Sequence, residues 1–235
     1  MPHFTPVVGK AMAALVAATV VGACAGPPPQ EPSITLTFVR HAQSQGNASG
    51  LNDTSVPGPE LTPLGEQQAQ KAADSLRRNH FDGIFASTMV RTQQTAAPLA
   101  RNLDEQVEVL PGLREIEAGW FEGHPEADAA TTYFLAPAMW LEGNRSARIP
   151  GSIDGNEFND RFTAAVQKIY DSGDKNPVAF AHGGSIMLWT MMNVRNPNDG
   201  LLEAHPLPNT GRVVLKGNPA NGWTLLDWDG LSQTE

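Results

Sequence analysis

The chain predicts an α/β fold, a three-layer α/β/α sandwich with a mostly parallel sheet. Short apolar runs that end in polar residues alternate with longer segments whose apolar residues recur at helical spacing. The 235 residues, 40% of them hydrophobic, are enough for one sizeable core. Strands that alternate with helices favour a parallel sheet covered on both faces, so we expect a single domain over residues 34–235.

The first predicted strand covers residues 34–39 and leads into Arg40 and His41. Its apolar residues alternate with Thr35 and Thr37, as in a buried strand. Its carboxyl end lies at the sheet edge where open α/β sheets bind ligands. A neutral imidazole can accept a phosphoryl group, and a guanidinium pairs with two phosphate oxygens. An Arg-His pair at the end of a strand is by itself more often a solvated surface pair than a catalytic one. The later segments are therefore needed to distinguish these two possibilities.

A helix and a second strand follow, and a second cation comes after them. The Thr-Pro pair at residues 62–63 starts a helix. Residues 81–86 form a strand, after which Ser87 or Thr88 can cap a helix that carries Arg91 in or near its first turn. An anion there would meet both backbone N–H groups and a guanidinium.

Two later segments supply further titratable groups. Glu115 lies among glycines and aromatic residues and is a candidate proton donor. The apolar run 177–181 predicts a strand that ends in His182 and a glycine turn, followed by a helix over 186–192. His182 is therefore a candidate second phosphate ligand.

The remaining scaffold contains one more helix, over residues 157–170, whose apolar stripe indicates core packing. Two late strands are expected at residues 212–215 and 223–228. The segment 117–150 is rich in aromatic residues and is expected to roof the pocket. Within it, Arg145 or Arg148 is a candidate to reach a second substrate anion.

Taken in order, these segments resemble the histidine phosphatase superfamily, in particular the phosphatase branch of the phosphoglycerate mutase-like proteins. The likeness rests on Arg40-His41-Ala42 with Ser44 and Asn47, and on residues 61–69, 87–96, 113–123, 181–186 and 208–210. It implies the same three-layer fold, with His41 as the nucleophile that forms a phosphohistidine. It also implies that Glu115 protonates the leaving oxygen. The implied phosphate ligands are Arg40, Asn47, Arg91 and His182.

Two positions depart from the family pattern. Ala42 stands where glycine is usual, and Phe121 where tryptophan is usual. Neither change removes a reacting group, so they bear on pocket shape more than on chemistry. The resemblance implies a metal-independent phosphomonoesterase that needs no cofactor and acts on a small phosphorylated substrate. The histidines also lack the close spacing of a zinc motif.

Two alternative functions stay open. A phosphoglycerate mutase-type phosphotransferase would use the same pocket residues, although the segment between Glu115 and His182 looks short for a mutase. A catalytically inactive, lipid-anchored protein that binds phosphorylated ligands is the other alternative, and the joint presence of all reacting residues argues against it. The sequence carries no signal for an oligomeric state.

The net charge of −9 argues against nucleic-acid binding, because no basic stripe is present to pair with phosphates.

The amino terminus predicts export. Residues 1–23 are expected to be a lipoprotein signal peptide, since the apolar run 11–21 is too short to span a bilayer and small residues precede Cys24 as in a bacterial lipobox. Residues 24–33 would then form a lipidated, proline-rich tether to the domain of residues 34–235. We expect a lipid anchor on the extracytoplasmic face of a bacterial cell membrane. An ordinary signal peptide or a buried amino-terminal helix are the alternatives.

Overall fold

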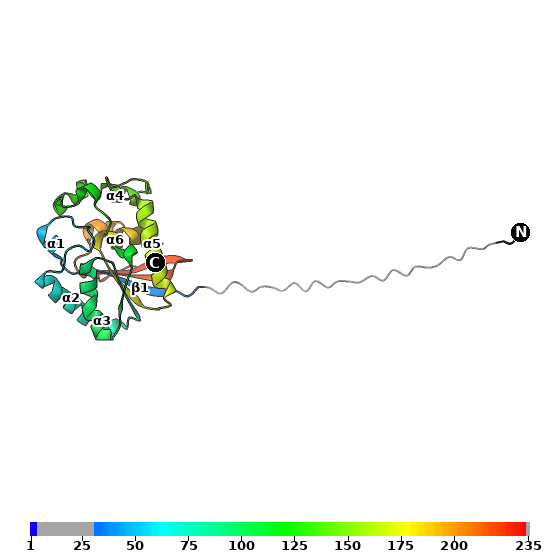
Figure 1. Cartoon of the computed structure of the whole chain (residues 1–235), viewed down its shortest axis with the longest axis horizontal. Coiled ribbons are helices and arrows are strands. Elements are labelled where there is room, and N and C mark those ends of the chain that lie inside the picture. Colours follow the sequence, from blue (N-terminus) through cyan, green and yellow to red (C-terminus); the bar gives the residue numbers. More distant parts are fainter. Residues whose placement is uncertain (4–30, 234–235) are drawn as a thin grey trace. The chain divides into compact units, whose positions relative to one another are not determined.

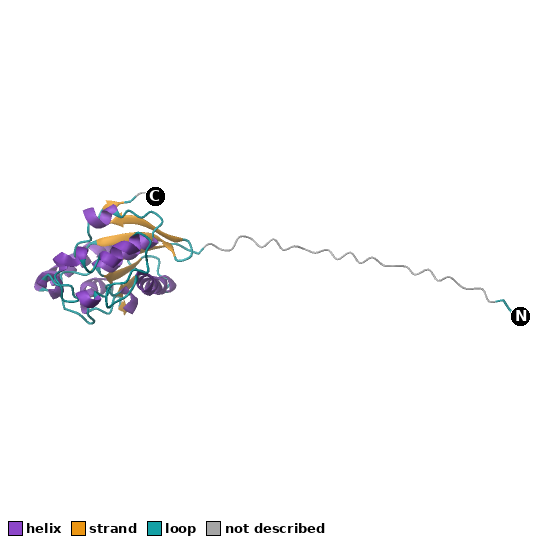
Figure 2. Cartoon of the chain, turned by 90° about the horizontal axis from the view of Figure 1, so that it is seen from above, coloured by secondary structure: helices purple, strands orange, loops and turns teal. Residues whose placement is uncertain are grey.

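Seven strands form one sheet in the computed structural model, which describes residues 1–3 and 31–233. Their order across the sheet is β3-β2-β4-β1-β5-β6-β7. Figure 2 shows the strands in orange and the helices in purple. The strands are β1 Ile34–Arg40, β2 Gly83–Ala86, β3 Val107–Val109, β4 Pro177–Ala181, β5 Arg212–Asn218, β6 Gly222–Trp228 and β7 Leu231–Ser232. The predicted signal peptide, Cys24 and most of the tether lie outside the described residues.

The sheet is parallel where it carries the predicted site residues and antiparallel beyond β1. Parallel pairs join β3 to β2, β2 to β4 and β4 to β1. Antiparallel pairs join β1 to β5, β5 to β6 and β6 to β7. The predicted fold class is confirmed, but the sheet is more mixed than expected. For β5–β6 and β6–β7 the cause is local: residues 219–221 and 229–230 join these strands by tight turns, and such turns can connect only antiparallel neighbours.

Helices cover both faces of this sheet. They are α1 Gln45–Ser49, α2 Pro63–Leu76, α3 Val90–Leu103, α4 Leu135–Leu141, α5 Gly155–Asp171, α6 Gly183–Asn193 and α7 Gly200–Ala204. Short 3₁₀ turns are η1 Arg77–Asn79, η2 Pro111–Leu113, η3 Gly119–Phe121 and η4 Glu126–Thr131. In Figure 1, α2 and α3 lie on one side of β1, and α5 and α6 on the other. Among the described helices, none is long and apolar enough to cross a membrane.

Alternate residues of β1 supply the two halves of the core. The Phe38 ring lies 5.5 Å from the ring of Phe162 in α5 and 5.8 Å from that of Trp189 in α6. Its neighbour Val39 packs instead with buried residues of α2 and α3, such as Leu99. Successive strand residues point to opposite faces, so one strand holds both helical layers in place. Arg40 and His41 follow at the end of this rigid strand.

The helix starts agree with the sequence at α2 and differ at α3. Thr62 accepts a hydrogen bond from the Gly65 N–H at 3.0 Å, as expected of a cap. The α3 helix begins only at Val90, and Ser87 does not cap it. The reason is that the Ser87 N–H bonds the Phe180 carbonyl at 3.2 Å and extends the strand ladder past β2. The Ser87 side chain is thereby left for another partner in the site.

Candidate active site

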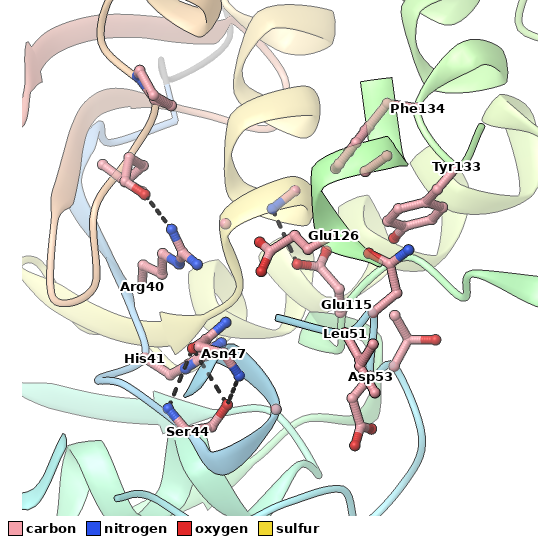
Figure 3. Close-up of a pocket in the computed structure, with 18 of the residues that line it drawn as sticks. Arg40, His41, Ser44, Asn47, Leu51, Asp53, Glu115, Glu126, Tyr133 and Phe134 are labelled. Atoms are coloured by element: carbon pink, nitrogen blue, oxygen red, sulfur yellow. Dashed lines mark hydrogen bonds between the residues drawn. The ribbon is translucent and has the colours of Figure 1, made fainter. Parts of the chain in front are cut away.

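A cavity of about 360 Å³ opens at the carboxyl ends of β1 and β4. Arg40, His41, Asn47, Arg91 and Glu115 all line it, so residues from distant parts of the chain converge as predicted. Figure 3 shows Arg40 and His41 on one side of the cavity and an aromatic pair on the other. The sixth predicted residue, the second histidine, lies behind this surface and is described below. Parallel strand ends thus create the concave site that the α/β pattern predicts.

His41 is a buried, neutral imidazole whose Nε2 carries no proton. Its backbone N–H bonds the Ala181 carbonyl at 3.0 Å, which extends the pairing of β1 with β4. Its Nδ1 lies 2.7 Å from the Ala42 carbonyl, which can only accept, so Nδ1 carries the hydrogen and Nε2 the lone pair. Burial, then the charges of Arg91 and Arg40, hold the His41 pKa well below its usual 6.5. The ring is therefore neutral near pH 7, as a nucleophile requires.

Two guanidinium groups lie beside this ring, that of Arg91 buried and that of Arg40 half-buried. Arg91 Nε donates to His41 Nε2 at 3.2 Å, and its Nη2 donates to the Asp53 carbonyl at 3.2 Å. Arg40 Nη1 donates to the Leu207 carbonyl at 2.6 Å. Burial lowers the pKa of both arginines, and the charge of Glu115 opposes that effect in each. Both groups remain cations, because an arginine stays protonated in proteins.

Several buried N–H groups at this place are left without a protein partner. Arg40 Nε, Arg91 Nη1 and His182 Nδ1 make no hydrogen bond to the described residues. Buried polar groups are nearly always hydrogen-bonded, so a cluster of unsatisfied nitrogens is typical of a ligand site. Two of the three are guanidinium donors, which suit the oxygens of an anion such as phosphate.

Asn47 is held at the edge of the site by its own short helix. Its Oδ1 accepts hydrogen bonds from the Ser44 N–H at 3.2 Å and from Asn209 Nδ2 at 3.3 Å. Asn209 Nδ2 also donates to the His41 carbonyl at 3.0 Å. These bonds use the oxygen of the Asn47 amide and leave its N–H₂ group for a ligand. Asn209 therefore ties the nucleophile to its neighbour, a role that sequence reasoning did not assign to it.

The Glu115 carboxylate lies at the amino terminus of α6. It accepts hydrogen bonds from Gly184 N–H at 3.0 Å, Ser185 N–H at 2.7 Å and Ile116 N–H at 2.9 Å. Carboxylates are stabilised at helix amino termini, where backbone N–H groups are unpaired. The helix end thus fixes the position of the candidate proton donor.

The α6 helix begins at Gly183, three residues before the predicted start at 186. A Cβ at Gly184 would lie 2.9 Å from Glu115 Oε1, and one at Gly183 would lie 3.1 Å from Arg40 Nε. The two glycines therefore allow a close approach of the acid and the cation. Glycine is a poor helix former, which is why the sequence indicated a turn at this position.

His182 is placed beside His41 but does not line the cavity itself. It is the N-cap residue of α6 and is wholly buried, with its ring centroid 5.2 Å from that of His41. Burial, then the charge of Arg91, holds its pKa well below the usual 6.5. Ser87 Oγ lies 2.8 Å from His182 Nε2, and this hydroxyl accepts the Met89 N–H at 3.1 Å. If the Ser87 hydroxyl donates its proton to Nε2, the ring hydrogen of His182 lies on Nδ1, which has no partner among the described residues.

The prediction that Arg145 or Arg148 reaches a substrate anion is wrong. Arg148 forms ion pairs of 2.8 Å with Asp154 and Glu157 at the start of α5, and Arg145 donates to the Met192 carbonyl at 3.0 Å. Neither lines the cavity, because each is committed to the scaffold.

The 117–150 segment divides between the cavity and the core. Tyr133, Phe134 and part of η4 line the cavity, while Trp140 stacks on Phe158 in the core at 5.6 Å between ring centroids. Glu126 in η4 also lines the cavity, as does Asp53. Neither carboxylate was predicted from the sequence, because Asp53 lies in an irregular segment and Glu126 starts a short 3₁₀ turn, and neither has a periodic pattern. Across the described part of the chain, no group of three or more His, Cys, Asp or Glu residues could hold a metal ion.

The chain belongs to the histidine phosphatase superfamily (branch 1), whose family model matches residues 36–229. A PE-PGRS family protein of Mycobacterium tuberculosis is 50% identical over 215 residues, which cover 85% of this chain but only 37% of that protein. The "Putative phosphoserine phosphatase 2" of Hydrogenobacter thermophilus is 30% identical over 183 residues, covering 72% of this chain and 88% of that protein. The predicted superfamily is therefore confirmed.

Solved structures show the same fold. A mycobacterial glucosyl-3-phosphoglycerate phosphatase superposes with a TM-score of 0.68 at 23% identity, covering 84% of this chain and 99% of that one. Other relatives carry the name of a phosphoglycerate mutase. The probable phosphoglycerate mutase of Yersinia enterocolitica is 28% identical, covering 82% of this chain and 91% of that protein. Membership alone therefore leaves the choice between hydrolysis and phosphoryl exchange open.

Replacing Gly184 by alanine tests the glycine cradle. The new Cβ would collide with Glu115 Oε1, which lies 2.9 Å from its ideal position, and should displace the carboxylate. We expect turnover of a phosphomonoester to fall about 10- to 100-fold, because a misplacement of about 1 Å in a catalytic group can slow a reaction by this factor. The free energy of unfolding should change little, because alanine favours the helix. The matched control is Gly200→Ala, where the nearest atom, Asn198 Oδ1, is 3.4 Å away. Unchanged kcat in Gly184→Ala would contradict the role of this cradle.

The two buried histidines predict acid-sensitive stability. Unfolded histidines take up a proton near pH 6.5, but His41 and His182 have lowered pKa values when folded. The unfolded state then binds more protons, so the free energy of unfolding decreases as pH falls below about 6.5, by up to about 1.4 kcal/mol per pH unit for each histidine. Urea unfolding at pH 7.5 and 5.5 measures this effect. His182→Asn should reduce the loss, whereas His80→Asn, at an exposed residue, should not.

Proposed function

We propose that this protein hydrolyses small phosphomonoesters through a phosphohistidine formed on His41. The observation that carries the proposal is the Nε2 lone pair of a neutral, buried imidazole beside guanidinium N–H groups that lack a protein partner. A phosphoryl group in line with Nε2 would satisfy these donors. Phosphoryl transfer depends mainly on such positioning and charge stabilisation.

In the first step His41 Nε2 attacks the phosphorus atom, so an N–P bond forms and the P–O bond to the alcohol breaks. Arg91 Nε, which bonds Nε2 in this structure at 3.2 Å, moves its hydrogen bond to a phosphoryl oxygen. Arg40, Asn47 and His182 supply further donors. Glu115 in its protonated form donates to the departing oxygen, and the alcohol leaves neutral.

In the second step water attacks the phosphohistidine. Glu115, now a carboxylate, accepts a proton from this water, and phosphate departs as the N–P bond breaks. Three backbone N–H groups hold the carboxylate in place for this role. The cycle then returns His41 to its neutral form, with Nδ1–H still donating to the Ala42 carbonyl.

The cavity supports hydrolysis over a phosphoglycerate mutase-type exchange. A phosphoglycerate carries a carboxylate besides its phosphate, and a mutase must hold both while the phosphoryl group changes position. Among the described residues that line the cavity, Arg40 and Arg91 are the only permanent cations, and both lie beside the nucleophile. No further cation is left for a second anionic group.

Replacing His41 should abolish turnover. His41→Ala removes the atom that forms the intermediate, so we expect loss of at least about 10⁴-fold in kcat, because the remaining groups act together with it. Brief incubation of the unmodified protein with a ³²P-labelled phosphomonoester should give an adduct that is stable to base, labile to acid and located on the peptide with His41. His80→Asn is the control and should keep full activity. An adduct on another residue would overturn the mechanism.

Replacing Glu115 tests the proton donor. Glu115→Gln should lower kcat for an alkyl phosphate by about 10²- to 10⁴-fold, since an alkoxide leaves poorly without a proton. Hydrolysis of p-nitrophenyl phosphate should be affected much less, because nitrophenolate leaves readily. Steady-state kinetics on the two substrates measure the ratio. Equal losses on both would assign Glu115 to positioning instead of proton transfer.

Export and lipidation of Cys24 are a separate proposal that rests on the sequence of residues 1–33 alone. The catalytic proposal does not depend on it.

A further inference from the structure

The cavity has two chemically different halves. Arg40 and Arg91 lie beside His41, where the phosphoryl group is transferred. The carboxylates of Asp53 and Glu126 line the same cavity, and no lysine or third arginine does so among the described residues. Figure 3 shows Glu126 between Arg40 and the aromatic pair Tyr133 and Phe134 in this view. When a phosphate group occupies the two arginines, the alcohol part of the substrate therefore lies beside the two carboxylates.

Glu126 and Asp53 are held in place by their own segments. The Glu126 N–H donates to the Gly50 carbonyl at 2.8 Å, which fixes the start of η4 against the α1 end. The Asp53 carboxylate accepts hydrogen bonds from the Ser55 N–H at 3.2 Å and the Ser55 hydroxyl at 2.7 Å. Burial lowers the pKa of both arginines; the charges of Glu115 and then Glu126 oppose this lowering at Arg40, and those of Glu115 and then Asp53 oppose it at Arg91. Both carboxylates are thus close enough to act on charges inside the cavity.

Aromatic rings complete this second half. The rings of Tyr133 and Phe134 lie 4.6 Å apart between centroids at an angle of 43°. The Tyr133 hydroxyl donates to the Ile116 carbonyl, which fixes the ring and leaves no free donor for an anion. Aromatic faces attract cations, most strongly where the site is partly shielded from water. Carboxylates beside aromatic faces are the combination that recognises an ammonium group.

We propose that the substrates are small phosphomonoesters whose alcohol carries an ammonium group, with the ammonium held by Glu126, Asp53 and the Tyr133–Phe134 pair. This inference rests on the proposed phosphatase function and names its substrate class. The reaction is hydrolysis: the P–O bond to the amino alcohol breaks, water supplies the oxygen of the released phosphate, and the alcohol retains its charge. A cavity of about 360 Å³ suits a molecule of this size.

Three phosphomonoesters of similar size test the charge preference. They are O-phosphoethanolamine, which is cationic beyond its phosphate, 2-hydroxyethyl phosphate, which is neutral there, and 2-phosphoglycolate, which is anionic. The unmodified protein should show a kcat/KM for the cationic ester about 10-fold or more above that for the anionic ester. The reason is that a carboxylate attracts an ammonium group and repels a second carboxylate when the charges lie a few ångströms apart. The neutral ester should fall between them.

Substitution of Glu126 tests where the preference originates. Glu126 is exposed, and its carboxylate makes no hydrogen bond in the described structure, so Glu126→Gln should fold normally. It should reduce the cation-to-anion ratio of kcat/KM about 5- to 10-fold, and Glu126→Lys should reverse the preference. Glu142→Gln, an exposed carboxylate at the end of α4 away from the cavity, makes the same change in net charge and should leave the ratio unaltered.

The outcomes separate the two proposals. Hydrolysis of p-nitrophenyl phosphate with equal kcat/KM for all three esters, or with a preference for the anionic ester, would overturn this inference and leave the phosphatase proposal intact. An equal loss on all three esters in Glu126→Gln would also overturn it, because Glu126 would then act only through Arg40. Absence of turnover of any phosphomonoester, p-nitrophenyl phosphate included, would overturn the phosphatase proposal and the substrate class together.

Discussion

The site depends on one constraint: the imidazole of His41 must stay neutral and buried close to two cations, the buried Arg91 and the half-buried Arg40. The charges of Arg40 and Arg91 and the loss of solvent all oppose protonation of His41, so its pKa is held well below the usual value. The same burial would be unfavourable for the guanidinium groups unless negative charge were near. Glu115 supplies it to both arginines, Asp53 to Arg91 and Glu126 to Arg40. The proposed nucleophile and the charges around it therefore form one arrangement, and a change in either alters the other.

The scaffold explains how this arrangement is held. β1 ends in Arg40, and its pairing with β4 continues through the bond from the His41 N–H to the Ala181 carbonyl. The next residue after β4 is His182, so parallel pairing places both histidines at the same level of the sheet. The α6 helix then begins at once and offers its N–H groups to Glu115. Two adjacent parallel strands and one helix start position most of the reacting groups.

The sequence predicted the parts of this site that follow directly from strand ends. Arg40, His41 and His182 each follow an apolar run, and their convergence needed only the rule that parallel strands align their carboxyl ends. The start of α6 was predicted too late, because glycines have low helix propensity and Gly183 and Gly184 therefore indicated a turn. Their actual role is to leave space for Arg40 and Glu115, and only the three-dimensional packing shows this. Arg148 was misplaced for a similar reason: a surface ion pair with Asp154 and Glu157 leaves no periodic signal. Asp53 lies in an irregular segment and Glu126 is the first residue of the short 3₁₀ turn η4, and neither place has an apolar periodicity that would indicate where its side chain points.

The charge balance of the cavity bears on how it would hold a phosphate group. Among the described residues, its lining carries two permanent cations, Arg40 and Arg91, and three acidic side chains, those of Asp53, Glu115 and Glu126. A phosphate dianion placed against the two arginines would bring further negative charge close to Glu115. The N–H groups of Gly184 and Ser185 each bond one oxygen of the Glu115 side chain, so this side chain is tied to the start of α6 and cannot simply turn away. The helix end that positions the candidate proton donor therefore also offsets the repulsion between it and a bound phosphate, because the amino terminus of a helix stabilises negative charge.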